Sequence, residues 1–249
     1  GLQCADWLLV DVGVWGWHQL SWSFPGGMTR VLQPELLDEL PSNDPRAVHS
    51  RRDLRRINKI MGNARPVIKF LRAAELKSPI TIAEIGAGDG NISAQIATAL
   101  SAVGVLGTLL LVDRQPLVAS EIRGWKVHRI EAEVFAFLEK AAPVDVIIAN
   151  LFLHHFTDEQ LREMFQQCAR LCNLFAASEP RRSSLAMWLS RRVRLIGCTE
   201  VTRHDAEISV RAGFTCTDLS KLWPDDAAWR LTERKAGLFT HFFGARRIP

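Results

Sequence analysis

From residue 80 onward, short apolar runs alternate with longer segments of helical pattern. The candidate strands are 80–85, 107–113, 125–130, 144–149 and 173–178, separated by helical stretches near 90–102, 115–122, 133–141 and 157–172. Continuous apolar strands separated by helices are typical of a parallel sheet covered on both faces. Two further runs, 228–234 and 238–246, predict a C-terminal antiparallel hairpin. The sequence therefore predicts an α/β fold with a doubly wound, mainly parallel seven-stranded sheet.

The residues before the first strand have a different pattern. Asp44-Pro45 predicts a helix start and Gly62-Asn63 a helix end, so we expect an N-terminal helical cap over 28–78 and one main domain over 79–249. Residues 1–27 are rich in tryptophan and end just before Met28. We expect this segment to be either non-native or a lid over the site.

Composition narrows the class of protein. The 249 residues are 47% hydrophobic and 23% charged, as in globular proteins, and a net charge of +4 argues against a dedicated nucleic-acid-binding protein. No apolar run reaches the roughly 18 residues of a membrane span. The five cysteines form no CxxC pair, so we expect reduced thiols, a cytoplasmic location and no metal site. The oligomeric state stays open.

The stretch EIGAGDGN, residues 84–91, follows the first predicted strand directly. Ligands of open parallel sheets bind beyond the carboxyl ends of the strands, where glycines let the backbone turn tightly and approach a ligand closely. The N–H groups of the following helix favour a carboxylate or phosphate. A dinucleotide fingerprint would need a third glycine at position 91, where the chain has Asn91, so a nicotinamide-dependent oxidoreductase is disfavoured.

The E-x-G-x-G-x-G spacing of residues 84–90, with Asp113 closing the second strand, is similar to motif I of the class I S-adenosylmethionine-dependent methyltransferases. The segment LFLHHF, residues 151–156, also resembles that family. The resemblance implies a Rossmann-like fold and S-adenosylmethionine as cofactor. It implies cofactor contacts from Glu84, Gly86, Ala87, Gly88, Asp89, Asn91, Asp113, Arg114, Glu133, Val134, Asn150 and Leu151.

Two of these residues have specific expected roles. Asp113 would accept hydrogen bonds from the ribose hydroxyls, and the alternative is that it caps the segment after it. Glu133 would accept from the adenine amino group, with Glu131 as the alternative. For a general base the candidates are His155 and His204, the second because Asp205 follows it. The LHH segment also admits a packing role for its histidines.

The wider chain resembles, less specifically, the small bacterial methyltransferases found beside type III polyketide synthases. It departs from them after the fifth strand, where an Asp-Leu-x-Arg-Ser run is expected and the chain has SEPRRSSLA. Glu179 and Arg181 are the candidates to replace that Asp and Arg.

The aromatic residues of the tail favour a small apolar or aromatic acceptor, one that bears a hydroxyl group. Trp188, Phe214 and Phe239 are among those that could build its pocket. An RNA or other nucleic-acid methyltransferase is the first alternative, but no Pro-Pro follows Asn150 and the chain has no Pro-Cys nucleophile. A non-catalytic, methyltransferase-like interaction protein is the second alternative.

Overall fold

The computed structural model describes residues 28–41, 43–115, 121–193, 197–225 and 227–248. The tryptophan-rich segment 1–27 lies outside these residues, as does most of the helix predicted near 115–122.

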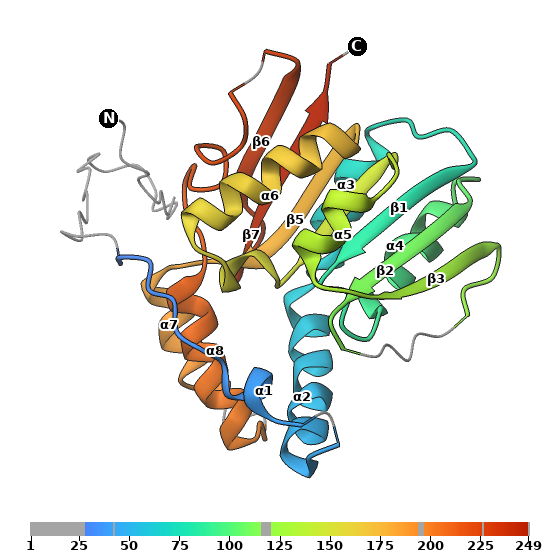
Figure 1. Cartoon of the computed structure of the whole chain (residues 1–249). Helices are drawn as coiled ribbons and strands as arrows, with labels where there is room; N and C mark the ends of the chain where they lie inside the picture. The colour runs from blue at the N-terminus through green and yellow to red at the C-terminus, as the bar shows by residue number, and fades with distance from the viewer. Residues whose placement is uncertain (1–27, 42, 116–120, 194–196, 226, 249) are drawn as a thin grey trace, which may run out of the picture.

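Seven strands form one sheet in the order β3-β2-β1-β4-β5-β7-β6 (Figure 1). They are β1 (Ile80–Ile85), β2 (Gly107–Asp113), β3 (Trp125–Glu131), β4 (Val146–Asn150), β5 (Leu174–Pro180), β6 (Trp229–Lys235) and β7 (Thr240–Arg247). The first five strands are parallel, and β7 runs antiparallel to both β5 and β6. The predicted doubly wound sheet with a C-terminal hairpin is confirmed.

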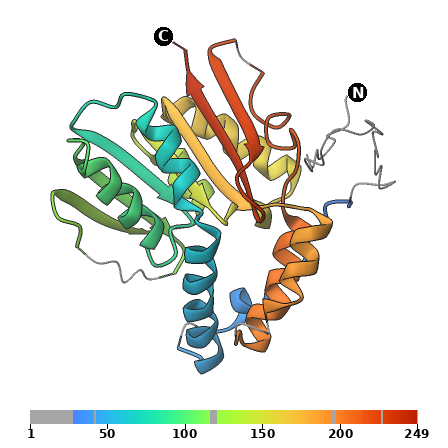
Figure 2. The ribbon, with the colours of Figure 1, turned by 180° about the vertical axis from the view of Figure 1, so that it is seen from behind.

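Helices cover both faces of the sheet (Figures 1 and 2). The helices α3 (Ala64–Arg72) and α4 (Asn91–Ser101) lie on one face, and α5 (Val134–Lys140) and α6 (Asp158–Leu171) lie on the other. Thr157 begins α6 with the capping box that its spacing from Gln160 indicates.

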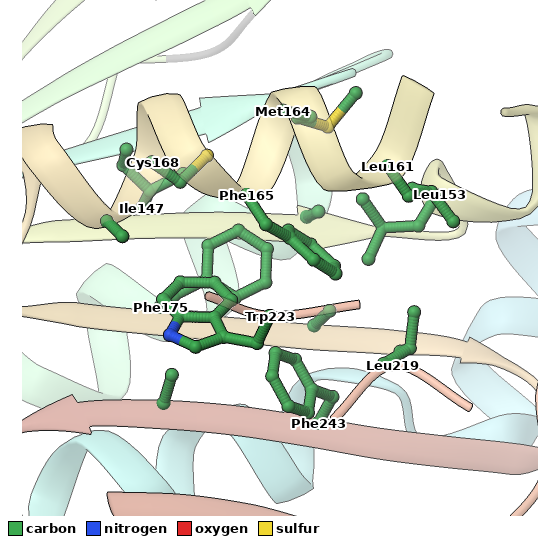
Figure 3. Close-up of a cluster of buried hydrophobic side chains, with 14 of the residues drawn as sticks. Ile147, Leu153, Leu161, Met164, Phe165, Cys168, Phe175, Leu219, Trp223 and Phe243 are labelled. Carbon is green, nitrogen blue, oxygen red and sulfur yellow. The ribbon is translucent and has the colours of Figure 1, made fainter. Parts of the chain in front are cut away.

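An aromatic cluster fills the space between α6 and the sheet (Figure 3). Phe165 of α6 packs on Phe175 of β5, with ring centroids 5.4 Å apart, and on Trp223 at 5.1 Å. Phe243 of β7 completes the cluster and is fully buried. The C-terminal strand therefore contributes directly to the core.

Four helices form a cap beyond the carboxyl ends of the parallel strands (Figures 1 and 2). They are α1 (Leu36–Glu39), α2 (Pro45–Met61), α7 (Ser184–Ser190) and α8 (Glu200–Ala212). The start and end predicted for α2 are confirmed, because the Asp44 side chain accepts from the N–H of Arg46 and Gly62 ends the helix in the left-handed conformation.

Buried aspartates join the cap helices to one another. Asp53 of α2 accepts from the N–H of Thr199 at 2.7 Å, which ties α2 to the start of α8. Asp205 of α8 accepts from the N–H groups of Leu36 and Leu37, at 2.8 and 3.0 Å, and so caps α1. The cap thus contains helices from both ends of the chain, and the division into 28–78 and 79–249 stays a prediction.

The cysteines do not all behave as expected. Cys168, Cys172 and Cys198 are buried free thiols, whereas Cys216 is disulfide-bonded, so the expectation of reduced thiols is wrong at that position. Within the described ranges, every helix is too short or too polar to cross a bilayer.

Candidate active site

The glycine loop after β1 has three residues in the left-handed region: Gly86, Gly88 and Gly90, with φ of 67°, 55° and 69°. A Cβ at position 86 would lie 2.1 Å from Cδ2 of Phe152, so that glycine is required by packing against the segment after β4. A Cβ at position 88 would meet no protein atom within 4 Å. Gly88 therefore faces open space, where a ligand can approach the backbone.

The acids that bracket the loop lie in different environments. Glu84 is 2% exposed and accepts a 2.5 Å hydrogen bond from the Ser93 hydroxyl of α4. Burial raises the pKa of Glu84 to about 8, so this carboxyl group holds a proton at neutral pH. Asp89 is on the surface, where it accepts from the N–H of Asn91 and lies 3.4 Å from the Arg55 guanidinium of α2. Glu84 therefore fastens the loop to α4, and Asp89 links it to the cap.

Asp113 ends β2 beside the same loop. One carboxylate oxygen accepts from the N–H of Gly88 at 2.8 Å, and the other accepts from the N–H of Gln115 at 2.9 Å. The second bond is the local cap that the sequence left as an alternative, and the first bond holds the glycine loop. Asp113 makes both contacts while lining the adjacent cavity.

A cavity of about 1750 Å³ lies between the carboxyl ends of the strands and the cap. Every residue predicted to contact the cofactor lines it except Asn91: Glu84, Gly86, Ala87, Gly88, Asp89, Asp113, Arg114, Glu133, Val134, Asn150 and Leu151. Glu133 lies on the cavity wall, whereas Glu131 does not. The structure thus brings together residues from the ends of four strands, as the parallel topology requires.

The cap side of the cavity is mostly apolar. Leu37 of α1, Ile60 of α2, Trp188 of α7 and Phe239 of the hairpin line it. Phe214, by contrast, is fully buried below the Arg30 guanidinium and is a core residue. The aromatic material predicted for an acceptor pocket is therefore divided between the cavity and the core.

His154 lies on the cavity wall between two carboxylates. Its Nδ1 is 2.8 Å from Oε2 of Glu179, and its Nε2 is 3.4 Å from Oε1 of Glu35. Burial alone would lower the pKa of His154, but the hydrogen bonds and charges of the two glutamates raise it to about 9. The same contact with His154 outweighs the burial of Glu35 and lowers the pKa of that carboxyl group to about 2.

The two histidines proposed as bases occupy different places. His155 lines the cavity, stacks on His154 with ring centroids 4.2 Å apart, and has Nδ1 3.7 Å from Oδ2 of Asp38. Burial and the charge of His154 lower the pKa of His155. The His204 side chain is 48% exposed and lies outside the cavity wall, and its neighbour Asp205 caps α1.

Sequence reasoning missed Glu35 and Asp38 as site residues. They belong to the segment ELLDEL, which has no motif, and they reach the histidines only because α8 holds α1 over the cavity. Glu179, which lies near the end of β5, was considered only as a replacement for the expected aspartate of the divergent run SEPRRSSLA. In the structure it is fully buried and accepts from the N–H groups of Phe152 and Leu153, at 3.0 Å each.

A family model described as a methyltransferase domain matches residues 82–173, from β1 to the residue before β5. The chain carries a methyltransferase domain. The class I fold and the transferase activity predicted from the glycine loop are thereby confirmed, and the domain contains most of the cavity residues that come from the sheet.

Solved methyltransferases share the fold. The plantazolicin methyltransferase BpumL, in complex with a triazolic desmethylPZN analog and SAH, has a TM-score of 0.62 and 13% identity, over 83% of this chain and 92% of that one. The plantazolicin methyltransferase BamL, with the same kind of analog and SAH, has a TM-score of 0.62 and 10% identity, over 82% and 92%. At these identities the likeness establishes the fold. Among curated protein sequences there is no significant match.

Proposed function

We propose that this methyltransferase domain methylates a small, apolar or aromatic acceptor that bears a hydroxyl group. The observation that carries the proposal is one continuous cavity with two kinds of wall. Gly88 and Asp113 line its sheet side, and Trp188 and Phe239 line its cap side. The apolar and aromatic side chains of the cap wall suit a flat apolar ligand better than they suit a charged nucleic-acid backbone.

S-adenosylmethionine is the cofactor of the reaction, in keeping with the matched domain and with the SAH bound to BpumL and BamL. In our proposal its ribose hydroxyls bind Asp113 and its adenine amino group binds Glu133. Asn150 and Leu151, at the end of β4, lie along the methionine part. The buried Oδ1 of Asn150 has no hydrogen-bond partner among the described residues, so it is available to accept from a ligand.

Methyl transfer from a sulfonium is an in-line displacement. When bound, S-adenosylmethionine would supply the methyl group: the bond from sulfur to the methyl carbon would break as the acceptor oxygen bonds to that carbon, and the hydroxyl proton would pass to water or to a base. Holding the two reacting atoms about 3–3.5 Å apart and excluding water supplies much of the acceleration. The cap helices would provide that enclosure, because Leu37 and Asp38 of α1 line the cavity and α1 is fixed there by Asp205.

Cofactor binding gives the first test. Titration calorimetry and thermal unfolding of the full chain should show that S-adenosylhomocysteine binds and that NAD does not. A ligand that binds only the folded state raises the free energy of unfolding by about 2.7 kcal/mol at 100 times its dissociation constant. Stabilisation by NAD instead of S-adenosylhomocysteine would contradict the assignment.

The acceptor class needs a separate assay. Transfer of labelled methyl from S-adenosylmethionine should be detected with substituted phenols and should change little between about 50 and 200 mM salt. RNA binding through 6–10 phosphate contacts would instead weaken by about 10³–10⁵ over that range. Salt-sensitive methylation of RNA, with no transfer to phenols, would overturn the small-molecule proposal.

A further inference from the structure

The strongest further feature is a cluster on the cavity wall, made of Glu35 at the start of α1 and of His154 and His155 after β4. One ligand atom from each of the three residues lies within 4.8 Å of the other two. All three residues line the cavity, so an ion that bound there would keep coordination positions open to a ligand. We propose that Glu35, His154 and His155 form a binding site for a divalent transition-metal ion of the zinc type.

The spacing between His154 and Glu35 fits a shared ion. Their facing atoms, Nε2 and Oε1, are 3.4 Å apart. Zinc binds histidine nitrogen and carboxylate oxygen at about 2.0–2.2 Å, so two ligand atoms at a tetrahedral angle are separated by about 3.4 Å. The third ligand atom, from His155, lies within 4.8 Å of the other two and would have to move closer to complete the site.

A carboxylate orients His154 by a hydrogen bond, and a second carboxylate lies near His155. Metal-binding histidines usually donate the N–H of their other ring nitrogen to a carboxylate, which fixes the tautomer and directs the free lone pair at the metal. Nδ1 of His154 is 2.8 Å from Glu179, and Nδ1 of His155 is 3.7 Å from Asp38. The arrangement leaves Nε2 of His154 directed at Glu35 and the cavity.

The nearby charges favour a cation. Two arginines near the cluster each pair with an aspartate: Arg30, which also interacts with Glu179, pairs with Asp158, and Arg114 pairs with Asp38. Among the described residues, the cationic group that lies directly between Glu35 and Glu179 is the imidazole of His154. The buried Glu179 and the partly buried Glu35 share one imidazole, which leaves negative charge for a metal ion to neutralise.

The expectation of no metal site was based on the spacing of the cysteines. The cluster proposed here contains no cysteine, so that spacing gives no information about it. Glu35 precedes His154 by more than a hundred positions, and the two meet only because α1 folds back over the cavity. In the proposed reaction, a metal here would bind an acceptor oxygen within the cavity. That role rests on the proposed function, whereas metal binding itself does not.

Cobalt(II) is the probe for the test, because its visible absorption reports both binding and the number of ligands. The tag-free full chain should bind one Co²⁺, with absorption typical of nitrogen and oxygen ligands, and Zn²⁺ should displace it. Glu35→Gln should weaken Co²⁺ binding at least about tenfold. Glu39→Gln, an exposed acid on the same helix, is the matched control and should bind like the wild type.

The orienting contact is tested separately. Glu179→Gln preserves the size of the side chain and should weaken Co²⁺ binding by about 10–100-fold. Loss of a carboxylate that hydrogen-bonds a metal-binding histidine has an effect of this size in other metal sites. Because Glu179 also binds backbone N–H groups, the fold of this variant is checked by circular dichroism, and Asp38→Asn gives a second, more exposed test. His204→Asn, which alters an exposed histidine outside the cavity, should leave binding unchanged.

Three outcomes would overturn the proposal. The first is the absence of saturable Co²⁺ binding, which would mean that a proton alone lies between His154 and Glu35. The second is equal affinity in Glu35→Gln and Glu39→Gln, and the third is binding that His204→Asn removes. Failure of the metal site would leave the S-adenosylhomocysteine titration unaffected, so it is distinguishable from failure of the proposed function.

Discussion

At the level of single residues, the glycines of the loop after β1 are needed for two different reasons, although they belong to one sequence motif. Gly86 is needed because Phe152 fills the space that a side chain would take, while Gly88 is needed to leave space open. Glu84 serves the fold in a similar way, because its buried carboxyl group binds Ser93 within the protein. Two residues of this ligand-binding motif, Gly86 and Glu84, are therefore required for packing of the fold.

Gly88→Val and Gly86→Val should fail in different ways. The Gly88 variant should keep its circular dichroism near that of the wild type and lose most of its affinity for S-adenosylhomocysteine, since the new side chain enters the cavity. The Gly86 variant should lose about 1–3 kcal/mol or more of unfolding free energy, because its Cβ overlaps the Phe152 ring. Denaturant unfolding and calorimetry measure the two effects. Identical behaviour of the two variants would show that the loop is misplaced.

Glu84→Gln should flatten the dependence of stability on pH. The pKa of Glu84 is about 8 in the folded protein, above its ordinary value near 4.5. The folded state thus binds more protons, and the stabilisation is complete below about pH 4.5 and is lost as the pH rises through about 8. Denaturant unfolding from pH 5 to about 9 should show a steeper decline for the wild type than for the variant. Parallel curves would show that Glu84 titrates normally.

At the scale of elements, α8 organises the cap. It fixes α1 through Asp205 and α2 through the contacts of Asp53 with Thr199 and Thr202. The four-residue helix α1 is too short to be stable alone, so its position depends on these tertiary contacts. The placement of Glu35 and Asp38 over the cavity follows from a side chain that lies about 170 residues later in the sequence.

Asp205→Ala should release α1 from the cap. Two backbone N–H groups would lose their acceptor, and an unsatisfied buried donor costs about 1–3 kcal/mol. We expect a lower free energy of unfolding by about that amount and faster hydrogen exchange at Leu36 and Leu37. The conservative change His204→Asn leaves the cap in place and is the control. Unchanged exchange at α1 in the alanine variant would contradict this account.

At the scale of the whole molecule, the sheet could be predicted because each strand carries its own local signal. β1 and β2 were predicted to the residue, and the hairpin was located within two residues, since continuous apolar runs and capping residues act over short distances. The glycine loop and Asp113 could be predicted for the same reason. The cap side of the site could not, because Glu35, His154 and Glu179 come together only through tertiary contacts between α1, β5 and the segment after β4.

The position of β7 inside the sheet has a consequence for synthesis of the chain. β7 lies between β5 and β6, so the last of the seven described strands in chain order separates two strands that were made before it. Until residue 247 has left the ribosome, β5 has an open edge and the aromatic cluster lacks Phe243. Exposed strand edges and apolar surfaces attract other chains and chaperones. The nascent protein should therefore reach its native sheet only after translation has passed β7, with the earlier βα units held as an incomplete, chaperone-accessible intermediate.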